Sequence, residues 1–124
     1  MFPQYSAAVR VFLCTKPTDM RKGFDGLFGM VQEVLGQDPL SGHLFLFLNR
    51  RRDRVKVLFW ERDGLVIWYK RLEAGTFQKL DPAASVDHKS GQAGLELSAT
   101  DLALLLSGID VTTAERRKRY ARAS

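Results

Sequence analysis

Side chains that could act as acids or bases near neutral pH are few in this chain of 124 residues. His43 and His88 are the histidines that could titrate near neutral pH, and Cys14 is the single cysteine. No activated nucleophile and no metal-ligand spacing accompanies either histidine, so the sequence predicts no catalytic residue, no metal site and no cofactor. The aspartates are mostly predicted caps and turn formers, although a metal-dependent nuclease that gathers several of them in space stays an alternative.

Cations and aromatic rings, in contrast, gather in two segments. Residues 49–72 carry eight cations against three acids, and residues 112–124 carry five against one, whereas the whole chain has a net charge of +5. The positive charge is therefore local, as binding to a polyanion requires. Arginine forks can hold phosphate oxygens, and rings on strands can stack on bases. The candidate nucleic-acid-binding residues are Arg50, Arg51, Arg52, Arg54, Lys56, Trp60, Tyr69, Lys70, Arg71, Arg116, Arg117, Lys118 and Arg119.

Each of these features also has a plain structural explanation. Trp60 and Tyr69 could pack in the core or under a helix, since large aromatic side chains are mostly buried. The arginines between residues 49 and 54 could simply be solvated, and the basic end could be a solubilising tail. The clustering of the signals, rather than any one of them, favours a binding surface.

Three strand-like runs position most of these candidates within residues 44–72, LFLFLNRRRDRVKVLFWERDGLVIWYKRL. An arginine-rich loop joins the first two runs, and Asp63-Gly64 is predicted to be the two-residue turn between the second and third. That turn would place Arg62 opposite Leu65 and Trp60 opposite Ile67. One face of the resulting hairpin would be core, and the other would present two aromatic rings and two cations, Trp60, Tyr69, Lys56 and Arg71, in the open.

The remaining elements complete the predicted fold. A strand is expected near residues 9–14, and a helix over residues 19–35, capped by Thr18 or Asp19 and ended by Gly36. Glycines inside that helix, Gly23 and Gly26, predict a close approach by the sheet or by a partner. A short extended piece is expected at residues 76–80 and an edge strand at residues 95–97. Ser98 with Asp101 then resembles a capping box for a helix over residues 102–106, and a last basic helix would follow residues 112–113.

The fold class is therefore α+β: an antiparallel sheet of four to five strands, one long helix packed on a face, and two short C-terminal helices. Residues 1–110 are expected to form one domain with a mobile loop near residues 81–94, and residues 111–124 a basic helix or tail. The N-terminus lacks a secretory pattern and no run approaches about 20 apolar residues, so membrane insertion is not expected. A single cysteine suits a reducing, cytoplasmic setting.

Residues 17–27 (PTDMRKGFDGL), 38–77 and 97–110 resemble the small accessory protein encoded by the second open reading frame of insertion-sequence family sixty-six. That protein is often called TnpB and is unrelated to the RNA-guided nuclease of the same label. The resemblance implies a bacterial mobile element whose separate transposase carries out strand transfer, and it supplies no catalytic residue. The positions that stand in the family pattern are Asp19, Arg21, Gly23, Gly26, Gly42, Asn49, Arg50, Lys56, Trp60, Gly64, Lys70, Arg71 and Leu72.

The functional hypothesis is a non-catalytic accessory protein for transposition. Its expected partners are DNA, either element ends or any duplex, and the transposase of the same element, with self-association left open. The alternatives are a protein-interaction module whose basic surface is incidental, and the metal-dependent nuclease considered above.

Overall fold

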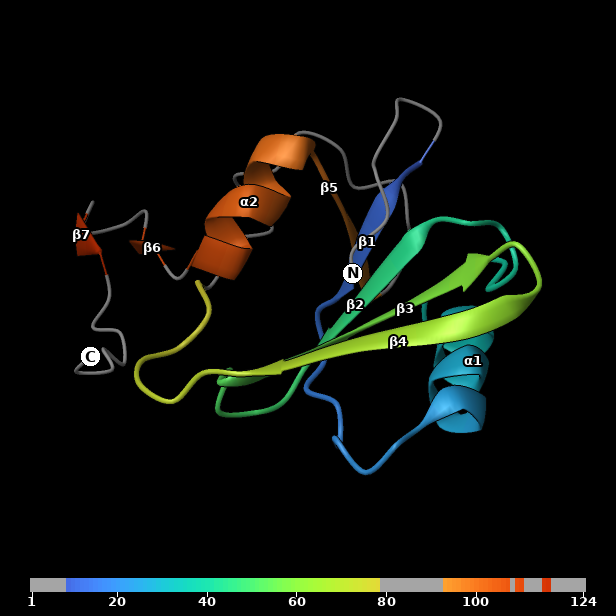
Figure 1. Cartoon of the computed structure of the whole chain (residues 1–124), viewed down its shortest axis with the longest axis horizontal. Helices are drawn as coiled ribbons and strands as arrows, with labels where there is room; N and C mark the ends of the chain where they lie inside the picture. The colour runs from blue at the N-terminus through green and yellow to red at the C-terminus, as the bar shows by residue number, and fades with distance from the viewer. Residues whose placement is uncertain (1–8, 79–92, 108, 111–114, 117–124) are drawn as a thin grey trace.

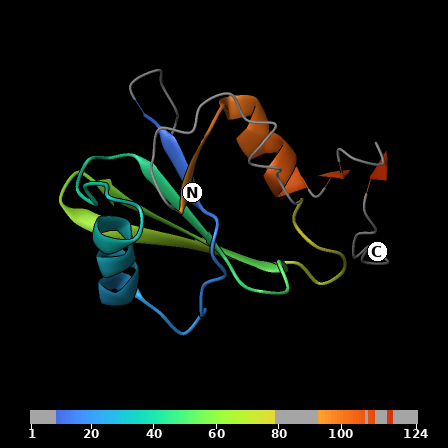
Figure 2. The same cartoon turned by 180° about the vertical axis from the view of Figure 1, so that it is seen from behind.

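A computed structural model describes residues 9–78, 93–107, 109–110 and 115–116. In the described part, five strands form one twisted sheet and the two helices lie on its opposite faces (Figure 1 and Figure 2). The elements are β1 (Val11–Cys14), α1 (Phe24–Glu33), β2 (Leu44–Leu48), β3 (Arg54–Glu61), β4 (Gly64–Arg71), β5 (Gly94–Leu97), α2 (Ala99–Ser107), and the two-residue strands β6 (Ile109–Asp110) and β7 (Glu115–Arg116).

The strand order in the sheet is β4-β3-β2-β1-β5. β1 and β2 run parallel, while the other three neighbouring pairs are antiparallel. The α+β class is confirmed, but the prediction of an antiparallel sheet is wrong because the sheet is mixed. Parallel neighbours need a long crossover, and the segment containing α1 supplies it between β1 and β2.

Both faces of the sheet carry a hydrophobic core. Every residue of β1 and β2 is buried, as expected for central strands covered on both sides. Alternate side chains enter different clusters: Leu46 and Val57 pack with Leu105 of α2, whereas Phe45 and Leu58 pack with α1. The expectation of one core face and one open face is therefore wrong, because α1 covers much of the second face.

Helix α1 is shorter than the predicted helix of residues 19–35. It begins after Gly23, which has no side-chain cap, and ends at Glu33. Asp19 does not cap it; its carboxylate accepts a hydrogen bond from the backbone N–H of Arg21 at 2.9 Å instead. This local turn competes with helix formation, as short acidic side chains commonly do. At the other end Gly36 has a φ of 63°, so the predicted stop by glycine is confirmed.

The close approach of the sheet that was predicted at the helix glycines is not seen, and the alternative of a close approach by a partner stays a prediction. A Cβ atom added at Gly23 would meet nothing within 4 Å, and the three atoms nearest to one added at Gly26 all belong to the Lys22 side chain, the first at 3.1 Å. No atom of the sheet is among these nearest neighbours. Gly23 is instead the residue that precedes the first turn of α1.

The hairpin of β3 and β4 turns one residue earlier than predicted. Glu61 pairs with Gly64 and Trp60 pairs with Leu65, so the central turn residues are Arg62 and Asp63. Arg62, not glycine, adopts the positive φ, of 56°. The predicted register is therefore wrong by two residues on β4. Because side chains alternate with a period of two, the assignment of residues to faces survives this shift.

The C-terminal part agrees with the prediction only as far as α2. The strand expected at residues 95–97 is confirmed as β5, an edge strand beside β1. Ser98 and Asp101 form the predicted capping box, with hydrogen bonds of 3.0 and 3.3 Å. The predicted last helix is not seen in the described residues 109–110 and 115–116, which pair as β6 and β7. Of the predicted loop near residues 81–94, residues 81–92 lie outside the described residues, and Gly94 already belongs to β5.

Candidate nucleic-acid interface

The loop between β2 and β3, residues 49–53, is called the basic loop here and is held in shape by Asn49. The Asn49 Oδ1 atom accepts hydrogen bonds from the backbone N–H groups of Asp53 and Arg54 at 3.1 and 3.0 Å. Its Nδ2 atom donates to the Asp53 carboxylate at 2.7 Å. These contacts fix the loop backbone locally, so the exposed Arg50 and Arg51 extend from an ordered base.

The arginines of this segment have different surroundings. Arg50 and Arg51 are exposed, as predicted. Arg52 turns inward: its Nη2 atom donates to the Phe77 carbonyl at 3.2 Å, and its own carbonyl accepts from the Phe77 N–H at 2.7 Å. Arg54 donates to the Tyr69 hydroxyl at 3.3 Å. The expectation of a loop with all its guanidiniums in water is therefore wrong for Arg52, which holds Phe77 against the sheet.

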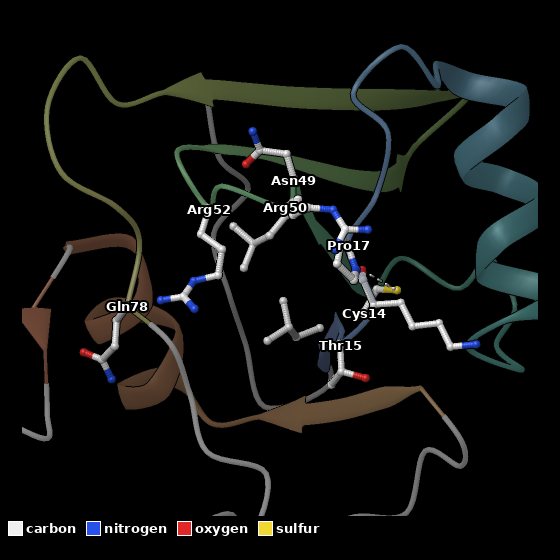
Figure 3. A pocket seen from close by; sticks show the side chains of 10 residues that line it. Cys14, Thr15, Pro17, Asn49, Arg50, Arg52 and Gln78 are labelled. Atoms are coloured by element: carbon white, nitrogen blue, oxygen red, sulfur yellow. Dashed lines mark hydrogen bonds between the residues drawn. The ribbon is translucent and has the colours of Figure 1, made fainter.

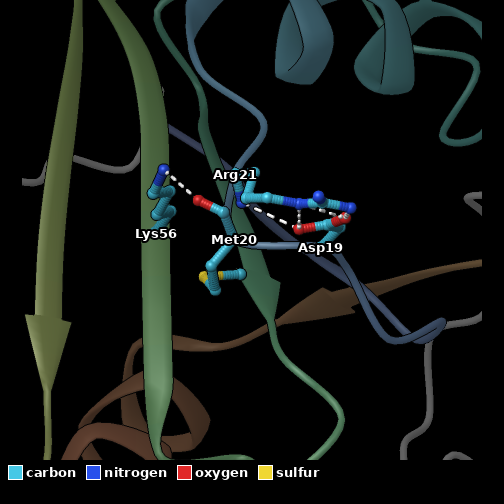
Figure 4. A network of polar contacts seen from close by, with 4 residues as sticks. All are labelled: Asp19, Met20, Arg21 and Lys56. Atoms are coloured by element: carbon cyan, nitrogen blue, oxygen red, sulfur yellow. Dashed lines mark hydrogen bonds and ion pairs between the residues drawn. The ribbon is translucent and has the colours of Figure 1, made fainter.

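Lys56 is 8% exposed and has a structural role. Its Nζ atom donates to the carbonyl oxygens of Met20 and Lys22, each at 2.8 Å, and lies 4.7 Å from the centre of the Tyr69 ring (Figure 4 shows the contact with Met20). Residues 17–23, called the anchor segment, are thereby tied to the middle of β3. The prediction that Lys56 contacts phosphate is not supported, because the amine is already satisfied and shielded from solvent.

Trp60 and Tyr69 lie on the same face of the sheet but far apart along the strands. Tyr69 pairs with Lys56 and Trp60 pairs with Leu65, so four residues of β3, about 13 Å, separate the two rings along the strand. Tyr69 is 47% exposed, while Trp60 is half-buried. Tyr69 therefore lies at the end of the sheet near the basic loop, and Trp60 lies toward the opposite end.

Lys70 and Arg71 point to opposite faces of β4, since they are neighbours on a strand. Arg71 pairs across the ladder with Arg54, and its Nε atom donates to the Glu73 carboxylate at 2.8 Å. This hydrogen bond raises the pKa of Arg71 above its usual value. Of the predicted basic tail, only the backbone of Arg116 is described, in β7; Arg117, Lys118 and Arg119 lie outside the described residues. The described members of the predicted set are thus spread over both faces and both ends of the sheet.

A hollow lies on either side of Arg50. One, between the basic loop and the anchor segment, is lined by Asp19, Arg50, Arg51 and Arg54 among others. The side-chain hydrogen bonds from Arg21 hold the pKa of Asp19 down to about 2, so this carboxylate stays charged. The local positive charge of that hollow is therefore partly offset.

The second hollow, of about 330 Å³, has a floor that includes Leu13 and Leu48 and a rim with three cations, Lys16, Arg50 and Arg52. Figure 3 shows Cys14 and Thr15 at the end of β1, Arg50 and Arg52 on the basic loop, and Gln78 around this hollow. No carboxylate is among its described lining residues. Positive charge is thus more concentrated on this side of Arg50.

Sequence reasoning missed the part played by the anchor segment. Thr18 is buried, and its backbone N–H donates to the Leu48 carbonyl at 2.8 Å, at the start of the basic loop. Lys16 joins the rim of the second hollow. The signal was present in the run PTDMRKG, whose proline and Asp19 favour a turn, but the apolar spacing that follows extended the predicted helix over it.

His43 and Cys14, two other described side chains of chemically reactive types, have structural surroundings. The Nδ1 atom of His43 accepts a hydrogen bond from the backbone N–H of Arg10 at 3.0 Å, and burial, followed by the nearby Arg10 cation, lowers its pKa. Cys14 is buried, and burial raises the pKa of its thiol. Within the described ranges, no three His, Cys, Asp or Glu residues gather so that they could hold a metal ion. No helix among those residues is long and apolar enough to span a membrane.

The fold and the site define a small α+β protein with an ordered, cationic loop at one end of a mixed sheet. The chain belongs to the family described as "IS66 Orf2 like protein", whose model matches residues 9–116. Membership associates it with an insertion sequence and therefore with transposition.

Two relatives come from Sinorhizobium fredii (strain NBRC 101917 / NGR234). One, named uncharacterized protein y4jC, is 33% identical over 112 residues, which cover 90% of this chain and 89% of the relative. The other, named uncharacterized protein y4hO, is 40% identical over 102 residues, which cover 82% of each chain. No solved structure gives a significant match.

Proposed function

We propose that this protein assists transposition of its insertion sequence by binding DNA through the basic loop, without carrying out strand transfer itself. Family membership supplies the association with transposition. The basic loop supplies the contact, with Arg50 and Arg51 as the principal phosphate-binding residues and Arg54 beside them. The proposed setting is the cytoplasm, where element DNA would be accessible.

The observation that carries this proposal is the combination of exposed guanidiniums with a loop already fixed by Asn49. Arg50 and Arg51 are exposed, while the backbone beneath them is held by the side-chain hydrogen bonds of Asn49. A preorganised loop loses less conformational entropy on binding than a loop that must first be ordered. Each guanidinium can then bind phosphate oxygens in two-point contacts.

Contacts of this kind carry little sequence information. Phosphate contacts position a protein on DNA, whereas base contacts specify a sequence. Tyr69 is an exposed ring whose hydroxyl group contacts Arg54, but one of its faces lies against the Lys56 amine. The proposal is therefore of binding to duplex DNA with weak sequence preference and strong salt dependence.

The test measures the affinity for duplex DNA across a range of salt concentrations, by fluorescence anisotropy, for the unmodified protein and the double variant Arg50→Ala, Arg51→Ala. Duplexes of element-end and random sequence are both used. Loss of two phosphate contacts should weaken binding on both duplexes and reduce the slope of log affinity against log salt by about 2.

The matched control is Arg62→Ala, which removes an exposed arginine from the turn at the other end of β3. Its affinity and salt slope should equal those of the unmodified protein. An unchanged slope in the double variant, or an equal loss in Arg62→Ala, would reject the basic loop as the site. Absence of DNA binding together with capture of the transposase in high salt would favour a protein-interaction module instead.

A further inference from the structure

Strand β4 forms one edge of the five-stranded sheet. Its eight residues pair with β3 on one side, from Gly64 opposite Glu61 to Arg71 opposite Arg54. No second strand pairs with β4 among the residues that the structure describes. In Figure 1 and Figure 2 the outer side of β4 faces away from the other strands.

The direction of each backbone group on β4 follows from one hydrogen bond. The Leu72 N–H donates to the Asp53 carbonyl at 2.7 Å, in the same register as the ladder of β3 and β4. Along a strand, successive N–H groups point to opposite sides, so the even-numbered residues bond to β3. The outer edge therefore displays the backbone N–H and C=O groups of Leu65, Ile67, Tyr69 and Arg71.

This edge lacks the usual protection against pairing. Proteins shield edge strands with short length, proline, bulges or charges placed along the strand. β4 has eight residues in an unbroken register, no proline, and an uncharged run from residue 64 to residue 69. The opposite edge, β5, has only four residues and leads directly into α2. Of the two edges, β4 is thus the one suited to accept another strand.

We propose that the occupant of this edge is β4 of a second copy of the chain, in antiparallel orientation. The net charges at the two ends of β4 favour pairing of two copies and decide the relative orientation of their strands. The turn end of the strand, with Glu61, Arg62 and Asp63, carries a net charge of −1, and the other end, with Lys70, Arg71 and Glu73, carries +1. Antiparallel pairing brings opposite ends together twice by symmetry, whereas parallel pairing would bring like charges together.

The pairing joins two five-stranded sheets into one continuous sheet. A register centred on Ile67 lets outward-pointing residues meet as hydrogen-bonded pairs, with Leu65 of one copy opposite Tyr69 of the other. The half-buried side chains of Leu65 and Ile67 and the exposed Tyr69 ring would then gain cover from the second copy. The inference does not depend on DNA binding, since the basic loop lies outside this edge.

The test compares Tyr69→Pro with Tyr69→Ala by size-exclusion chromatography with light scattering over a range of protein concentrations. Both variants lose the ring and its contacts with Arg54 and Lys56. Only the proline variant also lacks the backbone N–H group that points outward from the edge. An edge strand tolerates proline at such a position. Tyr69→Ala should still dimerise. Tyr69→Pro should dimerise about twenty-five-fold more weakly than Tyr69→Ala, because symmetry removes two hydrogen bonds, each worth about fivefold.

Amide hydrogen exchange of the unmodified chain gives a second readout that needs no variant. As protein concentration rises, the N–H groups of Leu65, Ile67 and Tyr69 should become protected, whereas those of Val66 and Trp68 should be protected throughout. A chain that stays monomeric at millimolar concentration would overturn the proposal. So would a dimer in which the odd-numbered amides stay unprotected, or equal dimerisation by the two Tyr69 variants.

Discussion

Replacement of Lys56 by methionine should destabilise the protein strongly, although it substitutes an apolar residue for a charged one at a buried site. The Lys56 amine makes two charge-assisted hydrogen bonds of 2.8 Å to carbonyls of the anchor segment. Each such bond contributes about 1.5–3 kcal/mol. Methionine keeps the packing of the stem, so we expect a loss of about 3 kcal/mol in the free energy of unfolding. For a domain of this size that corresponds to a melting temperature about 10 °C lower.

Urea unfolding and thermal melts measure this loss directly. Lys70→Met is the matched control, because Lys70 is a half-buried lysine on the neighbouring strand whose amine has no hydrogen-bond partner among the described residues. The control should change the free energy of unfolding by less than about 1 kcal/mol. Limited trypsin digestion should also show faster cleavage after Arg21 and Lys22 in Lys56→Met. A loss below about 1 kcal/mol, or one no larger than in the control, would refute the role of Lys56.

Two further predictions concern the single side chains of His43 and Gln78. The lowered pKa of His43 means that the folded chain favours the neutral ring, so the stability that it contributes is complete above pH 6.5 and is lost as pH falls below that value. His43→Asn should remove that part of the pH dependence in thermal melts, and an unchanged profile would contradict the assignment. Gln78 is 1% exposed, and neither polar atom of its amide has a hydrogen-bond partner in the described part of the chain. Gln78→Leu should therefore raise the free energy of unfolding by about 1 kcal/mol, measured in urea, and destabilisation would mean that the amide is satisfied after all.

Local patterns in the sequence predicted most of the elements correctly. The runs rich in aromatic and β-branched residues became β2, β3 and β4, and the short apolar alternation at Leu95 and Leu97 became β5. The capping box of Ser98 and Asp101 was also readable, because its partners lie only three residues apart. These features depend on neighbours in the chain, which a sequence displays directly.

The candidate site was predicted less well, because burial depends on residues distant in the sequence. Lys56 and Arg52 looked like the exposed arginines beside them, but Lys56 meets carbonyls 34 and 36 residues away, and Arg52 meets a carbonyl 25 residues away. Arg50 and Arg51 stayed exposed, as predicted. The mixed sheet was missed for a similar reason, since the parallel pairing of β1 with β2 is decided by the crossover through α1.

The sequence alone determined the local positive charge, the strand-forming segments and the family likeness, since composition, short-range periodicity and motif order are properties of the chain itself. Tertiary structure decided which cations face water, which one secures the anchor segment, and which strand is left at the edge of the sheet. Those outcomes depend on pairing and packing between distant segments. A lysine side chain is an exposed charge or a buried hydrogen-bond donor according to which distant segment packs beside it.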